Sequence, residues 1–227
     1  MRNLLILIPF LIISACSPVE FSPPPATPET IKIVYPPTLD WIEPAVQECA
    51  QQIPSMIPLL EVGGSDSLLE ADVYLLLGAP PEGSPGFATQ LGQESLIMIA
   101  NPAISPDSIN LLAIRKSYTS LESSYQAWTY PEGYRVREIF QSAILEKPYS
   151  PDVMLAPSPE AMLQAIEDDE LAIGFVPEAS LKKNVQEITL PKEIQAKLDL
   201  PLIALTQEET QETMRIFLAC LTEKATP

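Results

Sequence analysis

The chain has 227 residues, a formal net charge of −17 and no histidine. The missing histidine excludes Ser-His-Asp and Cys-His nucleophiles, His-ligated zinc and histidine proton shuttles. So acidic a chain is also a poor partner for nucleic acid or anionic lipid head groups. The sequence has no Cys-x-x-Cys pair, phosphate loop or calcium loop, so we expect no metal and no cofactor. A hydrolase that uses only carboxylates remains as the enzymatic alternative, and we expect no enzyme.

The first residues have the pattern of a bacterial lipoprotein signal. Arg2 precedes an apolar run from Leu4 to Ile13, and the small residues Ser14 and Ala15 precede Cys16. Such a run is too short to span about 30 Å of hydrocarbon, so residues 1–15 are expected to be a cleaved export signal. Cys16 is then the attachment point for lipid, palmitate included, which would anchor the protein outside the cytoplasm, in the periplasm or on the outer face. The alternative is an ordinary secretory signal in which Cys16 is incidental.

Residues 16–30 form a proline-rich segment without hydrophobic periodicity. Proline cannot continue a helix or a central strand, so this segment is expected to be an extended tether behind the lipidated cysteine. The remaining residues, 31–227, are apolar enough for one large domain or two small lobes.

Strand-like and helix-like segments alternate along the rest of the chain. Buried apolar runs predict strands at 31–35, 72–78, 96–100, 125–130, 152–156, 171–176, 185–190 and 201–206. Helical spacing predicts helices at 39–53, 108–118 and 209–223, after Gly133, and after Ser158, which is a favourable N-cap before Pro159 and Glu160. This alternation is typical of a mainly parallel α/β sheet.

Two cysteines remain besides Cys16. Cys49 and Cys220 both lie on predicted amphipathic helices near opposite ends of the chain. In an oxidising compartment an even pair favours a disulfide, and two separate buried thiols are the alternative.

The order of several short motifs resembles the type 2 periplasmic substrate-binding proteins of ABC importers, and within them the phosphate-binding branch. The motifs are Ile31–Leu39 opening a helix, Ala71–Gly78, Ile97–Pro102, Tyr130–Phe140 and Ala172–Pro177. The resemblance implies a two-lobed α/β fold with mainly parallel sheets and an interlobe cleft. The first lobe would comprise residues 31–98 with 186–227 and the second residues 99–185. Crossovers would lie near 97–102 and 175–188, and Cys49 and Cys220 would share a lobe.

The resemblance also implies a ligand in the cleft, held by backbone N–H groups at helix starts. The matching positions are Thr38 and Leu39, Gly78 and Ala79, and Gly133, Tyr134 and Arg135. The loop at Pro36-Pro37 and the acid Glu132 depart from the hydroxyl-rich cradle of phosphate-binding members, because proline donates no N–H and a carboxylate repels an oxyanion. The ligand is therefore expected to be a small molecule, with an anion as one candidate and phosphate itself disfavoured. Arg135 could instead be a solvated arginine at a helix start, and Lys182-Lys183 is expected to be a solvated surface pair.

The leading functional hypothesis is a lipid-anchored, monomeric solute-binding protein that closes two lobes on a small molecule and delivers it to an ABC permease. The alternative is a binding-protein fold that serves as a sensor or interaction module without transport.

Overall fold

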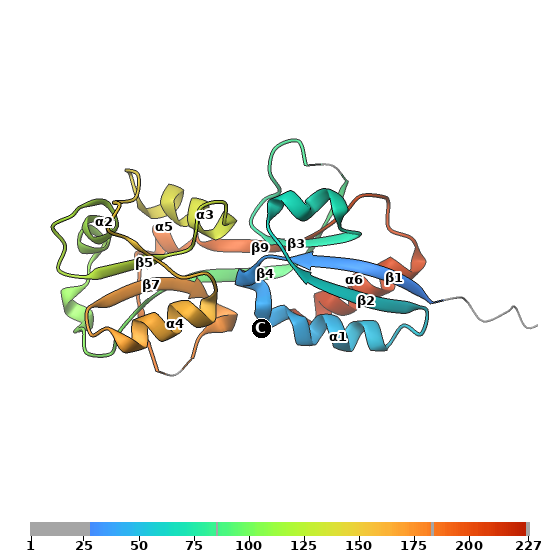
Figure 1. The fold of residues 1–227 in the computed structure, drawn as a ribbon, viewed down its shortest axis with the longest axis horizontal. Helices are drawn as coiled ribbons and strands as arrows, with labels where there is room; N and C mark the ends of the chain where they lie inside the picture. Colours follow the sequence, from blue (N-terminus) through green and yellow to red (C-terminus); the bar gives the residue numbers. More distant parts are fainter. Residues whose placement is uncertain (1–27, 85, 183, 226–227) are drawn as a thin grey trace, which may run out of the picture.

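The computed structural model describes residues 28–84, 86–182 and 184–225. The expected signal at 1–15, Cys16 and the first part of the tether lie outside the described residues. The last tether residues, Glu29 and Thr30, already belong to strand β1, because they pair with β2. None of the described helices is long and apolar enough to cross a membrane. The described chain forms two α/β lobes side by side (Figure 1).

The first lobe is built on three parallel strands at one end of the sheet. These are β1 (Glu29–Tyr35), β2 (Met56–Val62) and β3 (Val73–Leu77), in the order β2-β1-β3. Two 3-10 helices and two α-helices accompany them: η1 (Pro37–Ile42), α1 (Glu43–Gln51), η2 (Ser65–Glu70) and the C-terminal α6 (Glu212–Lys224). β3 is buried along its whole length, as its continuous apolar run predicts.

The second lobe contains the middle of the chain. Its strands are β5 (Gln126–Thr129), β6 (Met154–Leu155), β7 (Ala172–Pro177) and β8 (Gln186–Ile188). Its α-helices are α2 (Leu111–Thr119), α3 (Arg135–Ile144), α4 (Pro159–Asp168) and α5 (Lys192–Gln195), and its 3-10 helices are η3 (Pro106–Ser108) and η4 (Glu178–Ser180). The expected N-cap of α4 is present, since the Ser158 hydroxyl accepts a hydrogen bond from the Ala161 N–H at 3.2 Å.

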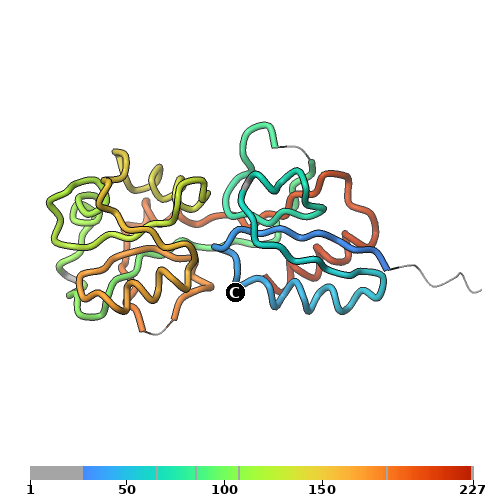
Figure 2. The backbone as a smooth tube through the Cα atoms, viewed as in Figure 1, coloured from blue at the N-terminus to red at the C-terminus, as the bar shows by residue number. Residues whose placement is uncertain are grey.

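Two antiparallel strands join the lobes. β4 (Phe87–Ala100) and β9 (Asp199–Thr206) run along the middle of the molecule, as the green and red segments of Figure 2 show. β4 pairs with β9 from Phe87 to Ser95 and with β7 from Leu96 to Ala100. The change of partner between Ser95 and Leu96 precedes the expected boundary at 98. β8, expected in the first lobe, pairs with Met98–Ala100 of β4 instead.

The sheet is mixed. Strands are parallel within each lobe, as predicted, but every pair that involves β4 or β9 is antiparallel. The reason is topological: β4 carries the chain out of the first lobe and β9 carries it back, so the two strands run in opposite directions. β2 and the first half of β4 were not predicted, because Pro58 interrupts the one and polar residues the other.

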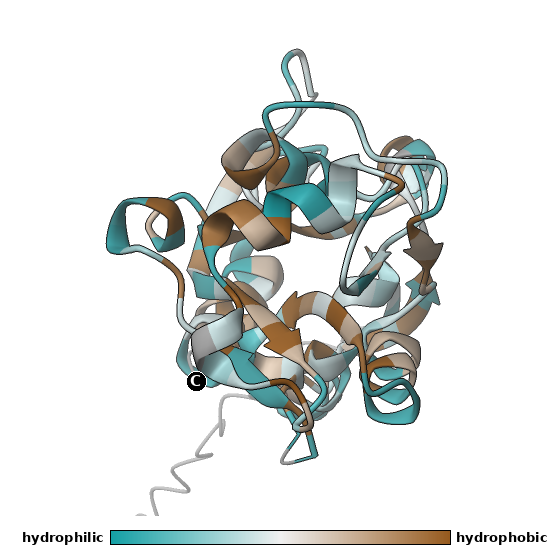
Figure 3. Cartoon of the chain, turned by 90° about the vertical axis from the view of Figure 1, so that its left-hand side faces the viewer, coloured by the Kyte–Doolittle hydropathy of each residue, from teal (hydrophilic) through white to brown (hydrophobic). Residues whose placement is uncertain are grey.

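Apolar side chains from both lobes form one large buried core, with a smaller cluster on the other face of the first lobe that includes Val34, Tyr74 and Leu76. In Figure 3 the brown, hydrophobic stretches lie mostly on strands and on one side of helices, and the connecting loops are mostly teal. The expected bridge joins Cys49 on α1 to Cys220 on α6, with 5.7 Å between their Cα atoms. Both helices therefore belong to the first lobe, as the resemblance implied.

Candidate functional site

The carboxyl ends of the parallel strands in the first lobe lie opposite the start of α3 in the second lobe. A cavity of about 250 Å³ lies where they meet. The first lobe contributes the loop after β1 (Pro36–Thr38), the loop after β2 (Gly63 and Gly64) and side chains of β2 and β3. The second lobe contributes Gly133, Tyr134 and Arg135. Open α/β sheets bind ligands outside the carboxyl ends of their strands, so this cavity is the candidate site.

Backbone donors face this junction from both lobes. η1 begins after Pro36 and α3 begins after Tyr134, and neither helix start has a side-chain cap. Within the described chain, the backbone N–H groups of Thr38, Arg135 and Val136 have no acceptor. Because α3 spans three turns, its positive dipole end adds to the attraction for a negative group.

Gly133 permits the turn that leads into α3. Its φ is +86°, in the left-handed region, and a Cβ there would meet no atom within 4 Å. The requirement at Gly133 is therefore conformational, and the space beside it stays open toward the cavity.

Arg135 is the cationic side chain of the site. Its Nη1 donates to Glu138 Oε2 at 3.0 Å, and its Nη2 donates to the carbonyl of Ala79 in the first lobe at 3.4 Å. The side chain is 41% exposed and its partner Glu138 is 57% exposed. An ion pair this exposed contributes about 0.3 to 0.5 kcal/mol, so Arg135 can turn toward a bound anion at little cost.

Arg137 has a different role two residues along α3. Its Nη1 donates to the Tyr130 carbonyl at 2.8 Å, its guanidinium lies 4.5 Å from the centre of the Tyr149 ring, and its side chain is only 14% exposed. Arg137 therefore holds the second lobe together and does not line the cavity.

The walls of the cavity are mostly apolar. Pro36, Pro37, Val62 and Leu76 supply aliphatic surface, and among the described lining residues none carries a carboxylate. Tyr74 is 7% exposed, and burial, with a smaller effect of the Asp66 charge, raises the pKa of its hydroxyl to about 12. Tyr74 therefore remains a neutral hydrogen-bond donor throughout the physiological pH range.

The remaining expected residues lie outside the cavity lining. Leu39 is fully buried in the core and its N–H donates to the Pro36 carbonyl at 2.9 Å. The Gly78 N–H donates to the Pro201 carbonyl at 2.9 Å, so it is also occupied. A Cβ on Gly78 would lie 2.8 Å from Ile139 Cδ1 of α3, so Gly78 lets the two lobes approach closely. Ala79 offers its carbonyl to Arg135 and thus contributes to the same interlobe contact.

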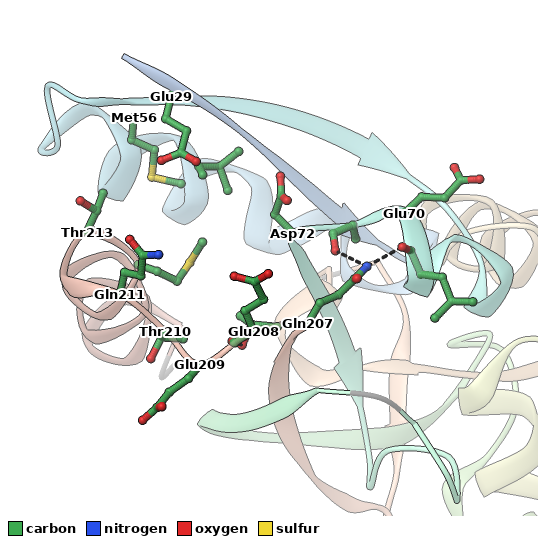
Figure 4. Close-up of a pocket in the computed structure, with 15 residues that line it drawn as sticks. Glu29, Met56, Glu70, Asp72, Gln207, Glu208, Glu209, Thr210, Gln211 and Thr213 are labelled. Atoms are coloured by element: carbon green, nitrogen blue, oxygen red, sulfur yellow. Dashed lines mark hydrogen bonds between the residues drawn. The ribbon is translucent and has the colours of Figure 1, made fainter. Parts of the chain in front are cut away.

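A second cavity, of about 430 Å³, lies at the far end of the first lobe between the start of β1 and the start of α6 (Figure 4). Its lining includes the acids Glu29, Glu70, Asp72, Glu208 and Glu209, and none of its described lining residues is a lysine or arginine. This cavity would repel an anion, unlike the interlobe cavity. Within the described residues no group of three or more acids and cysteines is placed to hold a metal ion.

The wall residues Val62, Tyr74 and Leu76 were not predicted as site residues. Tyr74 and Leu76 lie on a correctly predicted strand, but their approach to the loop after β1 depends on how β3 pairs with β1. The Gly63-Gly64 pair was the available signal for the loop after β2, since consecutive glycines mark a turn.

Solved structures with the same fold include both transport and regulatory proteins. A protein from Clostridium perfringens assigned as a phosphate ABC transporter substrate-binding protein, solved with bound phosphate, is 14% identical with a TM-score of 0.71 and covers 85% of this chain and 93% of its own. An ABC-type phosphate transport receptor from Vibrio cholerae is 17% identical with a TM-score of 0.63, covering 86% and 94%. The reduced regulatory domain of OxyR2 from Vibrio vulnificus is 17% identical with a TM-score of 0.67, covering 89% and 98%.

At these identities the likeness establishes the type 2 periplasmic-binding-protein fold alone. No curated protein matches the chain in sequence. The sequence pattern of one family, described as bacterial extracellular solute-binding protein, matches residues 84–226, which is more than half of the chain. The matched segment contains the second lobe, both connecting strands and α6. The chain therefore belongs to the bacterial extracellular solute-binding protein family.

Proposed function

We propose that this protein is a lipid-anchored solute-binding protein of an ABC-type importer, which closes its two lobes on a small anion. The observation that carries the proposal is the shared cavity, in which Thr38 of the first lobe and Gly133–Arg135 of the second lobe line one space. Unpaired backbone donors and a cationic side chain converge there, an arrangement suited to a negative group. The phosphate-binding proteins among the structural neighbours support a role in uptake.

Lobe closure would occur about the two connecting segments. We infer a hinge near Ser95–Leu96, where β4 changes partner, and near Leu198–Asp199, where β9 begins. With boundaries at these two points, residues 31–95 and 199–227 would form one lobe and residues 96–198 the other, in place of the expected 31–98 with 186–227 and 99–185. A ligand that contacts both lobes would stabilise the closed arrangement.

The role of Arg135 is testable by calorimetry with anions selected in a thermal-shift screen. Arg135→Ala should weaken binding of the best anion by about 1.5 to 3 kcal/mol, the range for hydrogen bonds to charged groups. The matched control is Arg215→Ala, which removes the same charge from an exposed position on α6. Equal affinities for the parent and both variants would remove Arg135 from the site.

The anchor is proposed at Cys16, from the small residues that precede it. Mass spectrometry of the membrane fraction should find a diacylglyceryl group on Cys16 at the mature N-terminus, and Cys16→Ala should release or stall the protein. A soluble mature chain with an unmodified Cys16 would contradict the anchor. The partners would then be the small ligand, the membrane through the lipid, and a permease, with the protein acting as a monomer.

A sensor or interaction module without transport is the second candidate. The likeness to the OxyR2 regulatory domain favours it, since the same fold serves regulation there. Co-purification of the tagged protein with a permease and its ATPase would support transport, whereas ligand binding without such partners would support the sensor.

A further inference from the structure

We propose that the ligand of the interlobe cavity is a small organic monocarboxylate with an apolar body, held by its carboxylate at Arg135 and by its body against the aliphatic walls. The inference rests on the proposed function, and it names the chemical class that this cavity accepts.

The polar groups of the cavity select an anion. The chain has 30 acidic residues, yet none of the described residues that line the cavity is acidic, and Arg135 is the one charged side chain among them. Thr38 is 2% exposed and Tyr74 is 7% exposed, both line the cavity, and no hydrogen bond joins either hydroxyl to another described residue. With the free N–H groups of Arg135 and Val136 at the start of α3, these donors suffice for one carboxylate, which offers about four lone-pair sites.

The walls exclude a fully hydrated anion. Pro36, Pro37, Val62 and Leu76 present aliphatic groups, and the two prolines have no N–H. Phosphate or sulfate would leave oxygens against this surface without a partner, and a buried polar group without a hydrogen bond is strongly disfavoured. A carboxylate carries its charge at one end, so its apolar body can occupy the remaining space.

The same lining disfavours amino acids and large ligands. An ammonium group needs an acceptor, and no carboxylate lies among the described lining residues. The cavity volume of about 250 Å³ suits a short acyl chain better than a large ligand.

The test is calorimetry on the purified full-length protein in detergent, with acetate, butanoate, 4-methylpentanoate, leucine and phosphate. Affinity should rise about fourfold for each CH₂ added to acetate, as expected for burial of apolar surface. Leucine has the skeleton of 4-methylpentanoate with an added ammonium group and should bind at least tenfold more weakly. Phosphate should show no measurable binding. Arg135→Gln should weaken 4-methylpentanoate binding more than tenfold, whereas Arg215→Gln should leave it unchanged.

The outcomes separate the two proposals. The monocarboxylate assignment is overturned if affinity does not depend on the chain length of the acid, or if leucine or phosphate binds more tightly than 4-methylpentanoate. If the compound that binds best then loses its binding in Arg135→Gln, the proposed anion-binding cleft itself survives. Absence of binding by every compound, or binding that Arg135→Gln does not alter, overturns both proposals. The melting temperature of each variant without ligand distinguishes loss of the site from loss of the fold.

Discussion

The bridge between Cys49 and Cys220 should supply a large share of the stability of the protein. It closes a loop of 171 residues and connects the first and last α-helices, α1 and α6. The chain-entropy relation for a loop of this length gives about 5 kcal/mol at 25 °C. Whole domains are stable by only about 5 to 15 kcal/mol, so removing the bridge should leave the first lobe close to unfolding. Cys49→Ala/Cys220→Ala is the appropriate variant, because alanine adds no polar group to the buried position of Cys49.

Urea unfolding, followed by the fluorescence of Trp41 in a Trp128→Phe background and of Trp128 in a Trp41→Phe background, measures this effect separately for each lobe. η1 carries Trp41 and β5 carries Trp128, so a bridge confined to the first lobe should shift the Trp41 signal most. The parent protein treated with reductant should unfold like the double variant, and the double variant should not respond to reductant. An unfolding free energy within about 1 kcal/mol of the parent would refute the entropic reasoning.

Three further predictions concern packing and charge. Arg137→Ala removes a guanidinium that donates to a backbone carbonyl at 2.8 Å, so it should lower the free energy of unfolding by about 1.5 to 3 kcal/mol in thermal or urea unfolding. The exposed control Arg215→Ala should lower it by less than about 0.5 kcal/mol. Gly78→Ala and Gly83→Ala both strain a positive φ, but only Gly78→Ala also brings a Cβ to 2.8 Å from the other lobe, so it should cost at least about 1 kcal/mol more. Burial raises the pKa of the Glu94 carboxyl above its usual 4.5, so the folded state binds more protons than the unfolded state. The free energy of unfolding should therefore fall as pH rises through and above 4.5. A pH series of melting curves should show this decline reduced in Glu94→Gln.

The sequence predicts the elements whose signals are local. Ser158 before Pro159 marks the start of α4, and the continuous apolar run of β3 marks a strand buried on both faces. β2 escapes such reasoning because Pro58 lies inside it. Pro58 is tolerated there because β2 is the edge strand of the sheet, a property that depends on its pairing with β1.

The candidate site likewise contains some residues that local sequence signals predict and others that only strand pairing brings there. Thr38 and Arg135 each follow a strand and stand near a helix start, so local pattern and family resemblance identify them together. Val62 is a wall residue only because β2 pairs with β1 in a register that sets Tyr35 opposite Val62. Register is a tertiary property, and a shift by one residue would turn Val62 to the other face. The chemical character of the walls, which distinguishes a hydrated anion from an organic acid, therefore could not be predicted from local sequence signals.

An anion site can exist in a chain of net charge −17, because the surface charges and the groups that touch a ligand act over different distances. At physiological ionic strength exposed charges are screened beyond about 8 Å, so the dispersed acids on the surface repel a ligand only weakly once it is at the cavity. In the proposed site the buried side chains of Thr38 and Tyr74 are screened much less, and the exposed Arg135 would act at contact distance, well within the screening length. If the proposal holds, Arg135, the neutral hydroxyl of Tyr74 and the unpaired N–H groups of α3 would determine binding locally, and the acidic cavity at the far end of the first lobe would repel the same ligand. Selectivity of an anion for the interlobe cavity would thus depend on the placement of a few donors and on the absence of carboxylates among its described lining residues, and not on the net charge.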